Sequence, residues 1–188
     1  MVDAVSEGAI AATSPSGASE VLPQRFEALM VRIGRLNCAW TNTESVLVEV
    51  LARLMGTPVR KAAVVFLTLN TTRARIDLVE RLVRLEDGGH GQLLPTLRTF
   101  RRLSRMRNKL NHSIYDVDGA SGTLQTRETR VVHADDGIEF GKVELVDDRE
   151  LERIDAAIRT LRDVNAALWA FAREPSPGSS AAHAQRCS

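Results

Sequence analysis

Apolar side chains recur at spacings of three and four residues along most of this chain, and this is the pattern of amphipathic α-helices. The longest run extends from Pro23 to Met55 and stops at Gly56. Pro23 suits a first helical position, because the N–H that it lacks would have no helical partner there. The last run extends from Asp147 to Arg173, and an aspartate at its start is expected to cap it. The chain is therefore expected to be built on long helices.

Three shorter helical patterns lie between these two runs. Thr57 and Pro58 open a very apolar segment that continues to Leu69. Its VVFLTL run would also suit a strand, but the capping residues at its start favour a buried helix. A third pattern covers RARIDLVERLVRLE, and a fourth runs from about Leu93 into the stretch RMRNKLNHS. The sequence thus predicts about five helices.

The composition changes after the fourth helix. GTLQTRETRVV and GIEFGKVELV are rich in Thr and Val, and HADDG separates them. Residues 122–146 are therefore predicted to form a two-stranded β-hairpin. Gly141 is a candidate bulge, because the apolar residues before and after it alternate out of phase. The predicted fold is an all-α helical bundle of about five helices with a β-hairpin inserted before the last helix.

Length and composition place these elements in one domain. The 188 residues are enough for a single hydrophobic core. Residues 1–20 and 174–188 are rich in Ala, Ser, Gly and Pro and carry few large apolar side chains. Because such segments cannot offset their ordering entropy, both are predicted to be disordered tails around a domain at 21–173.

Charge and cysteine content narrow the cellular environment and the binding partners that are expected for this chain. The 25 basic and 24 acidic side chains nearly cancel, so no global field draws the chain to nucleic acid or to an anionic membrane. The chain has two cysteines, no basic leader segment and no apolar run of membrane-spanning length. A cytoplasmic protein without membrane contact is expected.

Two charged residues fall where the helical pattern expects apolar ones. Arg107 alone among the charges of the fourth helix lies within its apolar half, and Glu44 lies in the apolar stripe of the first helix. A charge placed among core residues needs a partner. We therefore expect Glu44 and Arg107 to lie close together, or to open onto a shared polar cavity or subunit interface. The other basic residues of the fourth helix gather on its opposite side: Arg98, Arg101, Arg102, Arg105 and Lys109.

The stretch RNKLNH, from Arg107 to His112, consists of an Arg, a polar residue, three further residues and a His. This motif resembles that of the HEPN superfamily. The resemblance extends to a Trp and a Glu one turn apart in the first helix, and it covers about residues 24–171. It implies a homodimer in which two motifs meet across a twofold axis and form one metal-independent endoribonuclease site. Arg107, Asn108, His112 and Glu44 are the candidate site residues.

The residue types suit this chemistry. When the 2′-hydroxyl of RNA attacks the adjacent phosphate, a group with a pKa near neutrality must move a proton, and His112 is the candidate. The guanidinium of Arg107 can stabilise negative charge on phosphate oxygens without a metal, and Asn108 can orient either group. The two residues lie about 140° apart on an ideal helix, so aiming both at one phosphate requires a second chain or an unwinding near Asn111. The product that the resemblance implies is a 2′,3′-cyclic phosphate.

Three functions stay open on the sequence. The first is the HEPN-like endoribonuclease, a toxin or defence component held in check by an antitoxin or other regulatory protein. The second is a catalytically silent helical dimerisation or regulatory module in which Arg107 and His112 serve packing, and the third is a nucleotide-binding domain. No cofactor and no metal are expected, because His133, Asp135 and Asp136 lie in a turn that supplies no fixed fourth ligand.

Overall fold

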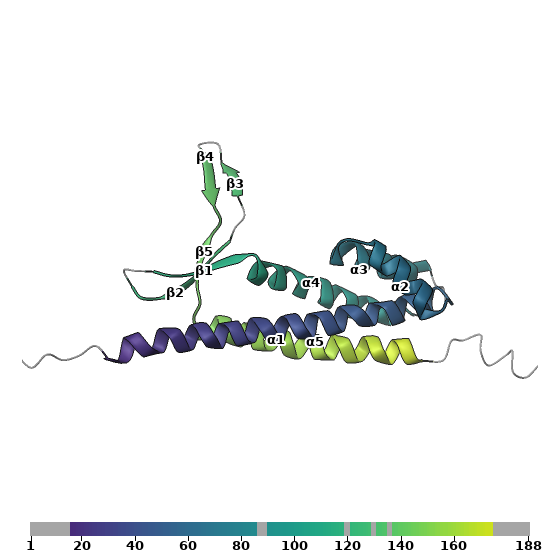
Figure 1. Ribbon diagram of the computed structural model, residues 1–188. Coiled ribbons are helices and arrows are strands. Elements are labelled where there is room, and N and C mark those ends of the chain that lie inside the picture. Colours follow the sequence, from purple (N-terminus) through teal and green to yellow (C-terminus); the bar gives the residue numbers. More distant parts are fainter. Residues whose placement is uncertain (1–15, 86–89, 119–120, 129–130, 135–136, 175–188) are drawn as a thin grey trace, which may run out of the picture.

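The computed structural model describes residues 16–85, 90–118, 121–128, 131–134 and 137–174. This part of the chain forms a helical bundle with β-strands inserted before the last helix, as predicted (Figure 1). The elements, in chain order, are α1 (Ser16–Leu54), α2 (Val59–Thr68), α3 (Thr72–Leu85), the 3-10 turn η1 (His90–Gln92), α4 (Leu93–Asn111), β1 (Ser113–Val117), β2 (Leu124–Glu128), β3 (Val131–Ala134), β4 (Gly137–Phe140), β5 (Val143–Leu145) and α5 (Asp148–Arg173).

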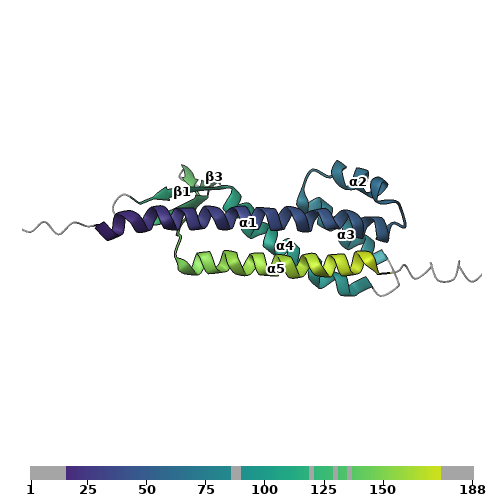
Figure 2. The same ribbon diagram turned by 60° about the horizontal axis from the view of Figure 1, so that its bottom comes forward.

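The first and last helices lie side by side and run in the same direction (Figures 1 and 2). An ion pair between Arg25 and Asp148 (2.8 Å) joins their N-terminal ends. At the other end, Arg53 pairs with Glu174 at 3.1 Å. The apolar residues that recur at spacings of three and four in the predicted last helix are all buried in α5: Leu151, Ile154, Ile158, Leu161, Val164, Leu168 and Phe171.

The fourth helix packs against this pair through an aromatic contact. The ring of Trp40 on α1 stacks on that of Phe100 on α4, with centroids 4.2 Å apart and an interplanar angle of 15°. Both side chains are essentially inaccessible to solvent. The aromatic pair fixes the middle of α4 against α1, and the last turns of α4 carry the RNKLNH motif beyond it.

The boundaries of α1 differ in part from the prediction. The helix begins at Ser16, so Pro23 lies inside it and residues 16–20 are helical, not a disordered tail. The proline removes one backbone hydrogen bond, but Leu22 packs against the core and holds this segment in place. The predicted stop at Gly56 is confirmed: its φ is 57°, and the N–H of Thr57 donates to the carbonyl of Ala52 at 3.0 Å, as in a Schellman motif.

The predicted β-hairpin is confirmed, but its two arms are divided between two antiparallel sheets. One has the order β1-β2-β5, and the other pairs β3 with β4, which project away from the helices (Figure 1). The strand β1 was missed, because Ile114 fits the spacing of the preceding helix; it is 51% exposed and belongs to the sheet. Gly141 lies between β4 and β5, where an added Cβ would come within 2.7 Å of the Cβ of Glu128. The change of phase therefore marks the passage from one sheet to the other.

Candidate functional site

Two neutral amide groups hold the guanidinium of Arg107. Its Nε donates to Oδ1 of Asn37 on α1 at 3.2 Å, and its Nη1 donates to Oδ1 of the neighbouring Asn108 at 3.1 Å. Its Cζ lies 5.9 Å from the ring centroid of Trp40. These contacts fix the direction of the side chain near the end of α4.

A reciprocal amide pair supports the same group. Asn37 donates to Oδ1 of Asn111 at 2.9 Å, and Asn111 donates back to Oδ1 of Asn37 at 3.0 Å. The Oδ1 of Asn37 therefore accepts from both Asn111 and Arg107. Because Asn37 belongs to α1 and the other two to α4, the cluster ties the motif to the first helix.

Arg107 differs from other basic residues of α4 in the chemical type of its side-chain partners. On the same helix, Arg101 contacts the carboxylates of Asp77 and Glu80, and Lys109 contacts that of Glu144. Among the described residues, no carboxylate forms an ion pair with Arg107. Since both of its hydrogen-bond partners are neutral, the guanidinium keeps its positive charge in a fixed position, which suits a bound phosphate.

His112 lies where α4 ends. It follows the last helical residue, Asn111, with φ −113° and ψ 14°, and its N–H donates to the carbonyl of Asn108 at 3.0 Å. Its side chain is exposed. The helix therefore continues through Asn111, and the backbone leaves helical geometry only at His112.

Tyr115 ties the strand after the motif back to the helix. Its hydroxyl donates to the carbonyl of Leu110 at 2.6 Å, in the last turn of α4. Burial, followed by the negative charge of Glu150, raises the pKa of Tyr115 to about 12. The native state thus favours the neutral phenol.

This raised pKa gives a testable pH dependence. The neutral phenol of Tyr115 contributes to the free energy of unfolding. This contribution is fully present below pH 10 and is lost as the pH rises through the folded pKa of about 12. Tyr115 is the single tyrosine of the chain, so ultraviolet absorbance of the phenolate reports on it alone. We expect the native midpoint near 12 and the urea-unfolded midpoint near 10. A native midpoint equal to the unfolded one would contradict this account.

Glu44 belongs to a different cluster. Its Oε1 accepts from Thr72 at 2.7 Å and from Nη1 of Arg75 at 3.2 Å, both on α3. The expected proximity of Glu44 and Arg107 is therefore wrong. The helical periodicity placed each charge on the correct face of its helix. However, Asn37 is the residue of α1 that contacts Arg107, and Glu44 lies two turns, about 10 Å, beyond it along α1. There α3 and not α4 supplies the partner.

Asn37 was not predicted from the sequence as a partner of Arg107. It lies one turn before Trp40 and two turns before Glu44, beside the apolar stripe of α1. That position was a signal that a polar contact faces α4. An asparagine on the border of a helix is common, whereas a charge within an apolar face is not. The sequence therefore did not single out Asn37.

The described residues include no group of three or more His, Cys, Asp or Glu side chains arranged to hold a metal. None of the described helices is long and apolar enough to cross a membrane. In comparisons with known family models, curated proteins and solved structures, the chain matches none of them.

Proposed function

We propose that this chain is a metal-independent endoribonuclease. The observation that carries the proposal is the guanidinium of Arg107, held by the amides of Asn37 and Asn108 with no carboxylate partner among the described residues. His112, whose imidazole can accept or donate a proton, lies at the end of the same helix. Together they supply the charge stabilisation and the proton transfer that RNA cleavage needs.

The proposed reaction is an internal phosphoryl transfer. His112 takes the proton of a 2′-hydroxyl, whose oxygen forms a bond to the adjacent phosphorus. The bond from phosphorus to the 5′-oxygen breaks, and that oxygen takes a proton from an acid. Arg107 stabilises the negative charge that develops on the phosphate oxygens. The products carry a 2′,3′-cyclic phosphate and a 5′-hydroxyl.

A homodimer completes the proposed site. The resemblance of RNKLNH to the HEPN motif supports two motifs meeting across a twofold axis, with the second His112 serving as the acid. Asn108 holds Arg107 in position. The proposal includes a role as a toxin or defence component held in check by a regulatory protein, since an active ribonuclease requires control.

The experiment is cleavage of diverse RNAs by the full chain in excess chelator. We expect cleavage to persist under these conditions, and to fail on a matched substrate that is 2′-deoxy at every position. Intact RNA after incubation with the folded dimeric protein would overturn the proposal, and so would cleavage of the 2′-deoxy strand.

A silent interaction module is the second candidate. It is favoured by exposed apolar side chains on α2, where Val64 is 65% and Leu67 is 67% exposed. Exposed apolar patches of this kind mark protein contacts. A chain that binds a partner through α2, loses that binding on Val64→Ser with Leu67→Ser, and leaves RNA intact would favour this candidate.

A further inference from the structure

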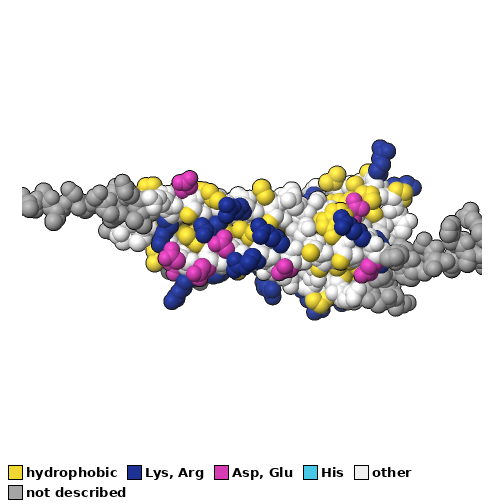
Figure 3. All heavy atoms as spheres, turned by 90° about the horizontal axis from the view of Figure 1, so that it is seen from below, with side chains coloured by type: hydrophobic (Ala, Val, Ile, Leu, Met, Phe, Trp, Pro, Cys, Tyr) yellow, Lys and Arg dark blue, Asp and Glu magenta, His cyan; other side chains and the backbone are white. Residues whose placement is uncertain are grey.

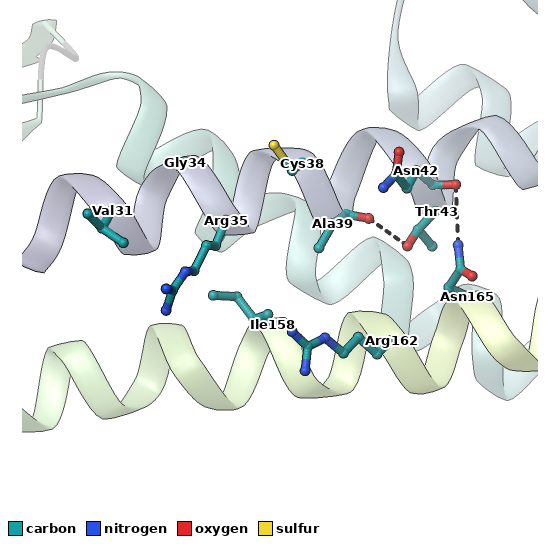
Figure 4. A pocket seen from close by; sticks show the side chains of 10 residues that line it. All are labelled: Val31, Gly34, Arg35, Cys38, Ala39, Asn42, Thr43, Ile158, Arg162 and Asn165. Carbon is teal, nitrogen blue, oxygen red and sulfur yellow. Dashed lines mark hydrogen bonds between the residues drawn. The ribbon is translucent and has the colours of Figure 1, made fainter.

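A groove of about 560 Å³ lies between α1 and α5 (Figure 4). Val31, Ala39 and Ile158 make its apolar part, and the amide side chains of Asn42 and Asn165 lie toward one end. Arg35 comes from α1 and Arg162 from α5, and both guanidinium groups reach into the gap between the helices, with Ile158 between them. The groove thus combines an apolar floor with two cationic groups.

The two arginines stand out by their lack of acidic partners. Neither Arg35 nor Arg162 forms an ion pair or a side-chain hydrogen bond with another described residue, whereas the nearby Arg32 pairs with Asp155 at 3.0 Å. None of the described residues that line the groove is acidic. Lys and Arg side chains lie near the middle of this face of the molecule, with Asp and Glu side chains beside them (Figure 3). Charge complementarity therefore calls for an anionic occupant.

The groove and the Arg107 site lie on two sides of the same turn of α1. Asn37 points to Arg107, and the next residue, Cys38, lines the groove. Successive side chains point about 100° apart on a helix that is about 10 Å wide. The surface between the two sites carries small residues: Cys38 is exposed, and an added Cβ at Gly34 would meet nothing within 4 Å. A polymer backbone can cross α1 at this turn.

We propose that this groove binds the phosphate backbone of the RNA strand beside the segment held at Arg107. The inference rests on the proposed function. Exposed guanidinium groups hold a lone phosphate weakly, because salt screens them. A strand already bound at Arg107 is different, since its neighbouring phosphates meet Arg35 and Arg162 at a high effective concentration. The groove therefore sets how long a strand must be to bind well.

The test compares uncleavable 2′-O-methyl RNAs of about 4 and about 16 nucleotides, the range of common single-strand site sizes. We expect Arg35→Gln with Arg162→Gln to weaken binding of the long strand roughly tenfold and to lower its salt slope by about 1.4, or about 0.7 per phosphate contact. Binding of the short strand should not change. The matched control is Arg60→Gln with Arg84→Gln, which removes two exposed arginines of α2 and α3 and should leave both strands unaffected.

A second measurement uses Cys38 as a reporter in a Cys187→Ser background. The long strand should slow alkylation of the Cys38 thiol, and the short strand should not. Equal affinities, slopes and alkylation rates for variant and wild type would overturn the groove proposal while leaving the proposed function intact. Groove binding without any cleavage would contradict the proposed function alone. Failure of the wild type to bind RNA would overturn both.

Discussion

Replacing Arg107 with alanine is expected to slow RNA cleavage by roughly 10²–10³-fold, the usual cost of removing one group that stabilises a developing oxyanion. The guanidinium is fixed by Asn37 and Asn108 before any substrate arrives, so its contribution requires no reorganisation during the reaction. The rate should be measured in excess chelator with the protein in excess over RNA, because these conditions isolate the chemical step from product release.

Arg105 provides the matched control for this substitution. It lies two residues earlier on α4 and is exposed, and its side chain forms no hydrogen bond or ion pair with another described residue. Arg105→Ala should leave the rate nearly unchanged, although it removes the same charge from the same helix. Arg107→Lys should remain well below wild type, since an ammonium cannot reproduce the two directed bonds. If Arg105→Ala and Arg107→Ala lower the cleavage rate equally, the rate depends on the net charge of α4 and not on the position of Arg107.

Replacing Trp40 with alanine is expected to lower the free energy of unfolding by about 3–5 kcal/mol. The side chain is 1% exposed and stacks on Phe100, so its removal leaves a cavity between α1 and α4. The same contact positions the helix that carries Arg107. Urea unfolding followed by circular dichroism measures the effect, with the midpoint and the slope analysed separately.

Trp169 is the control for this prediction. It is the other tryptophan of the chain, is only partly buried on α5, and has Arg173 over its ring at 4.7 Å. Trp169→Ala should cost clearly less than Trp40→Ala, because solvent already reaches its ring. If the two variants unfold at the same urea concentration, Trp40 does not hold α4 against α1 as described.

The helices were predictable because their periodicity is long and their ends are marked. The seven expected core positions of α5 are all buried, and Asp147 caps the helix by accepting from the N–H of Glu150 at 2.9 Å. The strands were harder to predict, because the apolar residues of a five-residue segment such as β1 continue the spacing of the helix before it. The three-stranded sheet also joins β1 to β5 through β2, and such pairing between distant segments leaves no local pattern.

The need of Arg107 for polar neighbours was predictable from the sequence, but the identity of those neighbours was not. A misplaced charge showed that Arg107 needs a polar neighbour, and the wheel separated it correctly from Arg105. The partner of Arg107 could not be predicted, because helical periodicity gives the direction of a side chain. It does not give the position along the helix at which another helix crosses. Asn37 therefore took the place assigned to Glu44, whose partner is Arg75.

The most direct test of the central claim is cleavage of one defined RNA in excess chelator by wild type and by His112→Ala, with the new ends identified by mass spectrometry. The account predicts that wild type leaves a 2′,3′-cyclic phosphate and a 5′-hydroxyl. It also predicts that His112→Ala is slower by roughly 10²–10⁴-fold, the usual contribution of a general acid or base. Equal rates for the two proteins, or 3′-hydroxyl ends from the wild type, would contradict it.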